Sequence, residues 1–182
     1  MSTDPGPIEA NDSSDARDER TGPTVAPERD GDPERGRIVV GIDDSEQAAT
    51  ALRWALQEGV IRQSTVEVVH SWSPPLSALP FGATLVIPVD EAAIDAAARA
   101  SVDDVVDTAL AEMAETPPEV LRTILPGGPA VTLVEVAEGA DLLVVGSHGR
   151  TGLRRMVLGS VAMACVNHAP CPVVVVRVPD SA

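Results

Sequence analysis

The stretch from Asp141 to Val176 constrains the fold of this chain more than any other part of it. Two short apolar runs, Leu142 to Val145 and Val173 to Val176, lie near its ends, with a glycine-rich turn and a helical pattern between them. Runs this short and continuous are typical of strands that are buried on both faces of a parallel sheet. Because parallel strands need a crossover connection, the stretch predicts a strand, a helix and a second parallel strand.

The turn in this stretch runs from Gly146 to Gly152, and the helix is predicted to begin at Gly159-Ser160. Glycines can adopt positive φ and let backbone N–H groups approach a ligand, while a helix N-terminus adds a partial positive charge. A strand that leads into such a turn and then into a helix therefore predicts a phosphate site, with a nucleotide as the ligand. The alternative is that the glycines only end a buried strand in a tight turn.

Apolar runs and helical patterns also alternate along the rest of the chain. We expect strands at residues 38–42, 65–70 and 120–125, and helices from Ser45 to about Gly59, from Asp90 to Glu115, and from Pro129 to Gly139. The proline-rich segment 73–89 predicts a long irregular loop. The helical residues expected to face the core are Ala48, Ala51, Leu52, Ala55, Leu56, Ala97, Val105, Val106, Ala109, Leu110, Met113, Val131, Val134 and Ala137.

This alternation predicts an α/β fold with a single doubly wound, Rossmann-like sheet of five parallel strands and helices on both faces. Ligands of such sheets bind beyond the carboxyl ends of the strands, where the winding reverses. The core must be aliphatic, because the 182 residues include one Phe, two Trp and no Tyr.

The charge of the chain excludes several functions. The formal net charge is −15, and all thirteen basic residues are arginines. The lack of lysine excludes a Walker-type P-loop, Schiff-base chemistry and a kinase-type lysine. An acidic surface also argues against nucleic acid as a partner.

The ends of the chain differ in composition from its middle. Residues 1–36 are rich in Pro, Gly, Asp, Glu, Ser and Arg, so we expect a disordered acidic tail. A folded domain is expected at residues 37–178, followed by a short tail at 179–182. The sequence contains neither a signal-peptide pattern nor an apolar run of 18 residues, so we expect a soluble, cytoplasmic protein without a membrane span.

The spacing Gly146-x2-Gly149-x9-Gly159-Ser160, with Val39 to Ser45 before it and Cys171-Pro172-Val173 after it, resembles the ATP-binding branch of the universal stress protein family. The resemblance extends from Arg37 to Val178. It implies an adenine nucleotide alpha hydrolase-like fold with strand order 3-2-1-4-5, which brings the ends of the first and fourth strands together. It also implies ATP as the ligand, with Mg²⁺ carried on the phosphates.

The same resemblance implies roles for individual residues. Asp43 is expected to contact the nucleoside, because a carboxylate accepts hydrogen bonds from ribose hydroxyls or the adenine amine but repels phosphate. The alternative is that Asp43 caps the following helix. The full set of expected nucleotide-binding residues is Gly41, Ile42, Asp43, Ser71, Gly146, Ser147, His148, Gly149, Arg150, Thr151, Gly152, Gly159, Ser160 and Val161.

Several arginines, histidines and cysteines near the predicted site allow more than one role. Arg150, Arg154 and Arg155 either compensate the charge of a triphosphate or form a solvated cluster. His148 is expected to serve structure or ligand contact rather than catalysis, and no histidine has the spacing of a metal motif. Cys165 and Cys171 are most simply buried, reduced thiols.

Three functions agree with this pattern. The first is a stress-response regulator that binds ATP, the second is a slow ATPase that uses the same pocket, and the third is a protein-interaction module without nucleotide. The last strand, Pro172 to Arg177, is apolar on both faces and is expected at the sheet edge. The family resemblance implies a homodimer built along it, through Val173 to Arg177.

Overall fold

A computed structural model describes residues 35–73, 77–78, 84–85, 90–149 and 158–178. Its main sheet has five parallel strands in the order β5-β2-β1-β6-β7, which confirms the expected order 3-2-1-4-5. These strands are β1 (Arg37–Gly41), β2 (Thr65–Trp72), β5 (Val120–Pro126), β6 (Leu142–Gly146) and β7 (Val173–Val176). The remaining two, β3 (Ser77–Ala78) and β4 (Thr84–Leu85), form a separate antiparallel pair within the segment expected to be irregular.

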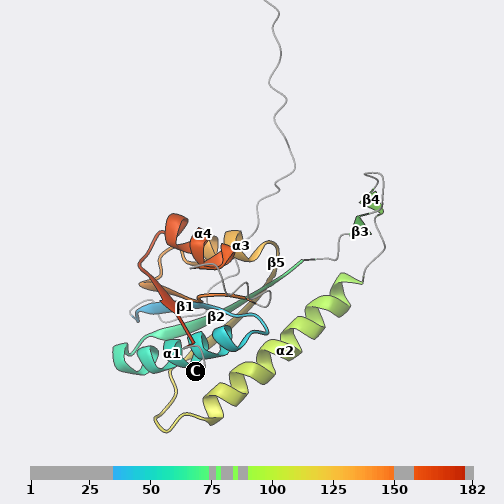
Figure 1. The fold of residues 1–182 in the computed structure, drawn as a ribbon. Helices are drawn as coiled ribbons and strands as arrows, with labels where there is room; N and C mark the ends of the chain where they lie inside the picture. The colour runs from blue at the N-terminus through green and yellow to red at the C-terminus, as the bar shows by residue number, and fades with distance from the viewer. Residues whose placement is uncertain (1–34, 74–76, 79–83, 86–89, 150–157, 179–182) are drawn as a thin grey trace, which may run out of the picture.

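Four helices cover the two faces of the sheet, as Figure 1 shows. On one face lie α1 (Glu46–Arg62) and α2 (Glu91–Ala111), and on the other lie α3 (Pro129–Val136) and α4 (Ser160–His168). Each face has its own aliphatic cluster, with Val68 and Leu52 in the first and Val69 and Leu143 in the second. The three-layer α/β fold predicted from the alternation of elements is therefore confirmed.

The strand order sets the place where a ligand can bind. The chain leaves β1 toward β2 on one side and returns to β6 on the other side of β1. The two crossovers leave a crevice beyond the carboxyl ends of β1 and β6, and this is where ligands of doubly wound sheets bind.

The end of α1 differs from the prediction. The helix continues past Gly59 to Arg62, and its C-cap is Gln63, with a φ of 56°. Gly59 is buried within the helix, where an added Cβ would lie 2.6 Å from Cγ2 of Val66. This glycine therefore allows α1 to pack closely on β2 and does not end the helix.

In two helices, α2 and α3, the residues that face the core differ from those predicted. In α2, Ala97 is exposed and Val102 is buried instead, and the helix ends at Ala111 rather than Glu115. In α3, Val131 is 62% exposed, while Leu133 faces the core. The prediction of Val131 assumes one apolar stripe, but this short helix lies on β1 and β2 and buries only the side that meets those strands.

The end of α3 is a smaller difference. Its C-cap is Ala137, in the right-handed region, rather than Gly139. Gly139 follows with a φ of 71°, so the glycine serves the turn into β6.

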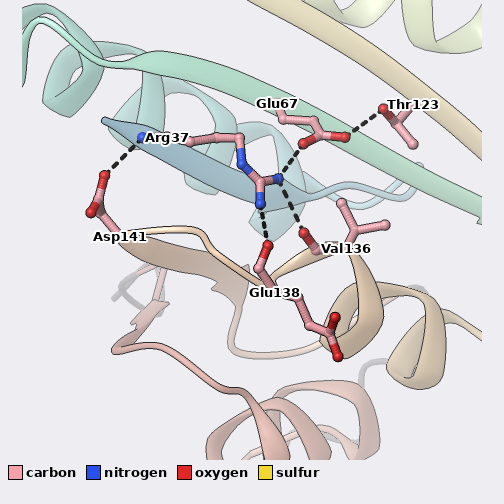
Figure 2. Close-up of polar contacts among 6 residues, drawn as sticks. All are labelled: Arg37, Glu67, Thr123, Val136, Glu138 and Asp141. Atoms are coloured by element: carbon pink, nitrogen blue, oxygen red, sulfur yellow. Dashed lines mark hydrogen bonds and ion pairs between the residues drawn. The ribbon is translucent and has the colours of Figure 1, made fainter. Parts of the chain in front are cut away.

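A polar cluster closes the amino end of the sheet and was not foreseen from the sequence. Figure 2 shows the guanidinium of Arg37, on β1, paired with the carboxylate of Glu67, on β2. Arg37 also donates hydrogen bonds to the carbonyls of Val136 (3.1 Å) and Glu138 (2.6 Å), at the end of α3. Thr123 on β5 donates to the second oxygen of Glu67 at 2.6 Å. One buried cluster thus ties three strands and a helix end together.

Among the described helices, none is long and apolar enough to cross a membrane. The expected acidic tail falls outside the described residues except for Arg35 and Gly36, and so does the tail at 179–182.

Candidate functional site

A cavity of about 560 Å³ lies beyond the carboxyl ends of β1, β2 and β6. The volume is in the range of cavities that hold small molecules and cofactors. All of the predicted site residues that the structure describes line it, namely Gly41, Ile42, Asp43, Ser71, Gly146, Ser147, His148, Gly149, Gly159, Ser160 and Val161. The topology therefore brings the front motif and the glycine motif to one cavity. Arg150, Thr151, Gly152, Arg154 and Arg155 lie outside the described residues.

Asp43 joins the cavity to the start of α1. One oxygen of its carboxylate accepts hydrogen bonds from the backbone N–H of Ser45 (3.1 Å) and from the Ser45 hydroxyl (2.5 Å). The Ser45 oxygen in turn accepts from the backbone N–H of Ala48 at 3.2 Å, which confirms Ser45 as the N-cap. Asp43 therefore supports the helix cap through one oxygen, as the alternative interpretation predicted.

The second oxygen of Asp43 lies against the glycine turn. A Cβ added to Gly149 would be 2.8 Å from this oxygen, so the two motifs approach each other closely. A Gly149→Ala change would displace the carboxylate as well as any ligand. It is therefore a poor test of phosphate binding by itself.

The cavity glycines serve close packing rather than unusual backbone angles. Of the described glycines, those with positive φ are Gly127 and Gly139, and neither belongs to the glycine motif. An added Cβ would lie 2.7 Å from Cδ1 of Leu133 at Gly41, and 3.0 Å from Cβ of Gln47 at Gly146. The expectation of positive φ in the motif is wrong for these residues, and the close approach that the structure shows at them is to protein side chains.

The N-terminus of α4 opens onto the cavity. Its N-cap is Gly159, and no side chain of the described residues caps the helix. The N–H of Gly159 donates to the carbonyl of Ser147 at 2.7 Å, which fixes the helix start beside the glycine turn. The backbone N–H groups of Ser160 and Val161 belong to the first turn, which has no partner within the helix. Such an end favours an anion.

Two polar side chains of the cavity are held by the fold. Ser147 is buried, and its hydroxyl lies 3.1 Å from Nδ1 of His148. The Nδ1 of His70 lies 3.0 Å from the carbonyl of Ile42. Because a carbonyl only accepts, Nδ1 of His70 carries the proton in this contact, and a neutral ring has its free acceptor at Nε2.

The sequence interpretation missed part of the cavity wall. Strand β2 continues to Trp72, beyond the predicted end at His70, so His70, Trp72 and Ser73 also line the cavity. Pro129 and Leu133 of α3 form another part of the wall. The sequence contained a sign that α3 begins at the cavity, namely the proline at its first turn. That turn follows the carboxyl end of β5, at the edge of the sheet where ligands bind.

The cavity wall also contains a second acidic residue, Asp44. Asp44 lines the cavity beside Asp43, and its carboxylate accepts a 3.5 Å hydrogen bond from Ser101 on α2. Within the described parts of the chain, no group of three or more His, Cys, Asp or Glu side chains could hold a metal ion.

Cys165 is buried and Cys171 is half-buried, so the expectation of two buried thiols is correct only for the first.

Comparison with known proteins identifies close relatives. Residues 34–177 match the model of the universal stress protein family. The universal stress protein Rv2623 of Mycobacterium tuberculosis is 33% identical over 148 residues, which cover 79% of this chain and 48% of that protein. The chain spans about half the length of the curated relatives it matches first.

Solved structures show the same fold. The universal stress protein UspA from Lactobacillus plantarum is 26% identical, with a TM-score of 0.66 over 78% of this chain and 97% of that one. A universal stress protein in complex with cAMP is 24% identical, with a TM-score of 0.58 over 79% and 97% of the two chains. A family member from Arabidopsis thaliana with AMP bound is 19% identical, with a TM-score of 0.51 over 80% and 93%.

Proposed function

Because the chain belongs to the universal stress protein family, whose model it matches over residues 34–177, we propose that its cavity binds an adenine nucleotide, with ATP as the physiological ligand. The observation that carries the proposal is the convergence of Asp43 and Gly149 beside the open N-terminus of α4 in one cavity. Two proteins of the same fold contain adenine nucleotides, cAMP in one and AMP in the other.

We assign the nucleoside to the β1 side of the cavity and the phosphates to the N-terminus of α4. Asp43 lies on the β1 side, where a carboxylate suits ribose hydroxyls or the adenine amine. Ser160 and Val161 lie at the N-terminus of α4, which suits phosphate. We assign the backbone of Gly41, Ile42 and Gly146 to the cavity floor. Mg²⁺ would enter with the phosphates, since it prefers phosphate oxygens to an all-protein site.

The role that follows is a regulatory one, in which nucleotide occupancy changes how the protein meets its partners during stress. Hydrolysis needs a positioned water and cationic groups at the transferred phosphate. The described part of the cavity offers acids and histidines, so we expect no phosphate release above background. Release of phosphate from ATP by the purified protein would favour the slow ATPase instead.

Nucleotide binding is tested first by mass spectrometry of the ligand released on heating freshly purified protein, and by calorimetry with ATP, AMP and cAMP in the presence of Mg²⁺. We expect adenine nucleotide in the released fraction and saturable binding by calorimetry. If neither experiment finds a nucleotide, the proposal fails and the protein-interaction module remains.

The orientation of the ligand is tested with Asp43→Asn, which keeps the shape of the side chain and the acceptor that faces Ser45. If Asp43 contacts the nucleoside, this variant should bind ATP about 5- to 100-fold more weakly, because a charge-assisted hydrogen bond is lost. If Asp43 faces the phosphates, removal of its charge should strengthen binding. Asp104→Asn, at an exposed position of α2 away from the cavity, makes the same change in net charge and should leave affinity unaltered.

We also propose that two copies pair along β7, through Val173 to Arg177. The strand lies at the sheet edge, and its four valines are only half-buried in the single chain. The carbonyl of Pro172 accepts from Leu143 on β6, and that of Val176 accepts from Ser147 just after β6, so in this parallel pair the backbone of Val175 faces outward. Val175→Pro should therefore yield monomers in sedimentation equilibrium, while Val175→Thr, which keeps the N–H, should stay dimeric. A wild-type monomer would disprove the pairing.

A further inference from the structure

The hydrogen-bond ladder between β1 and β2 ends at the cavity. Its last register pair is Gly41 with Val69, and its last bond runs from the N–H of Ile42 to the carbonyl of Val69 at 2.9 Å. In a parallel pair the next bond would join the N–H of Ser71 to the carbonyl of Ile42. Among the described residues, that carbonyl accepts instead from Nδ1 of His70, at 3.0 Å. A side chain thus takes the place of the backbone donor.

The position of His70 on β2 explains how its ring reaches this carbonyl. Side chains alternate along a strand, so His70 lies on the same face as Val68, which belongs to the apolar cluster under α1 and α2. Ile42 belongs to that cluster too and is 8% exposed. His70 and Ile42 both line the cavity. The bond therefore lies where the core meets the cavity, and there a hydrogen bond is stronger than in water.

This bond fixes the start of the turn that carries Asp43. Asp43 directly follows Ile42, and one of its oxygens accepts from the N–H of Ser45 at 3.1 Å. The turn between β1 and α1 is thus held at two points, by His70 at its start and by Ser45 at its end. The other oxygen of Asp43 lies close to Gly149, so a shift of the turn would disturb both motifs of the cavity.

From these contacts we infer that His70 is a positioning residue of the nucleotide site. Its Nδ1–H holds the carbonyl of Ile42, and through the turn it sets the place of the Asp43 carboxylate against the ligand. The inference rests on the proposed nucleotide function and names a residue that orients a binding group.

The test compares two replacements of His70. Asparagine can place its amide nitrogen where the imidazole has Nδ1, so His70→Asn keeps the donor, while His70→Phe keeps a ring and removes the donor. AMP should bind His70→Phe about 5- to 30-fold more weakly than wild type in calorimetry, because the carbonyl of Ile42 loses its partner and the turn is released. His70→Asn should stay within about threefold of wild type. Equal losses in both variants, or no loss in either, would overturn the inference.

A double-mutant cycle with Asp43→Ala distinguishes positioning from direct contact with the ligand. If His70 acts through the Asp43 carboxylate, His70→Phe should weaken AMP binding by less than about twofold in a protein that lacks this carboxylate. The same fold-change in both backgrounds would mean that the ring acts on the ligand independently of Asp43, and the inference would be wrong. If His70→Phe does not fold, His70→Leu, which also lacks a donor, takes its place in each comparison.

Amide hydrogen exchange, followed by NMR, gives a readout that needs no ligand. The N–H groups of Ser45 and Ala48 bond within the turn, so they should exchange faster in His70→Phe and at the wild-type rate in His70→Asn. His168→Phe is the matched control, because it makes the same replacement at the exposed end of α4. It should alter neither these rates nor AMP affinity. Unchanged exchange in folded His70→Phe would show that the ring does not hold the turn.

The two proposals fail in different ways. If wild type binds no AMP, the nucleotide function and the role of His70 in it are both overturned. If wild type binds AMP and His70→Phe binds it equally well, the nucleotide function stands and only the positioning role is lost.

Discussion

Breaking the ion pair between Arg37 and Glu67 should destabilise the domain without changing its cavity. The Glu67 side chain is 2% exposed and that of Arg37 is 14% exposed, so solvent screens the pair weakly. Glu67→Gln keeps the shape of the side chain and removes the negative charge. The guanidinium of Arg37 then stays charged in a place largely shielded from solvent, where the carbonyls of Val136 and Glu138 still accept hydrogen bonds from it.

The size of the effect follows from these contacts. Removal of one partner from a buried ion pair costs about 3–5 kcal/mol. The two carbonyls and the glutamine oxygen still accept from Arg37, so we expect the lower end, about 3 kcal/mol. For a protein of this length, 1 kcal/mol corresponds to about 2–4 °C in melting temperature. The variant should therefore melt about 6–12 °C below wild type.

Thermal and urea unfolding of Glu67→Gln, Arg37→Met and the double variant measure this effect. The double variant removes the uncompensated charge, so it should be more stable than the sum of the single losses predicts. AMP affinity of the folded variants should match wild type, because the pair lies at the amino end of the sheet. A loss below about 1 kcal/mol for Glu67→Gln, or additive losses in the double variant, would refute the reasoning.

Three further changes test other parts of the fold. Gly41→Ala should cost about 1–3 kcal/mol in urea unfolding, because its methyl would lie 2.7 Å from Cδ1 of Leu133; in a Leu133→Ala background, which lacks that carbon, the same change should cost less. Ser45→Ala should cost about 1 kcal/mol, since the bond to the N–H of Ala48 is lost; equal stability would contradict its role as N-cap. Burial raises the pKa of the Cys165 thiol to about 11, so the ultraviolet thiolate absorbance of a folded Cys171→Ser variant should still be rising between pH 9 and 11, and a plateau below pH 9 would disprove this.

The strands were predictable, because a short continuous apolar run fits a strand that is buried on both faces of a sheet and fits few other elements of a folded domain. The runs at 38–42 and 142–145 became β1 and β6 with shifts of one residue at either end. Helix faces were less predictable, because alanine and valine appear on both sides of these helices. Val131 is exposed and Thr132 is buried, so apolarity alone does not tell which side of α3 meets the sheet.

The sequence predicted which motifs lie at the same site, but it did not predict the contacts between their residues. That Asp43 and the glycine turn share a cavity follows from the strand order, which the family resemblance supplied. The contact between Asp43 and Gly149, and the packing of Gly41 on Leu133, depend on side-chain positions that no sequence pattern specifies. The pairing of Arg37 with Glu67 joins residues 30 positions apart on neighbouring strands, and neither residue belongs to a motif.

Strand β2 shows how stability and ligand binding are separated in this fold. Near its amino end Glu67 is buried and bonded by two partners, so its replacement changes the free energy of folding. At its carboxyl end Ser71 is half-buried, and its hydroxyl has no hydrogen-bond partner among the described residues, so its replacement by Ala should leave folding unaffected or improve it. Since both side chains lie on the same face of one strand, the difference cannot come from the strand itself. It comes from what covers each end, which is the end of α3 over Glu67 and a cavity over Ser71.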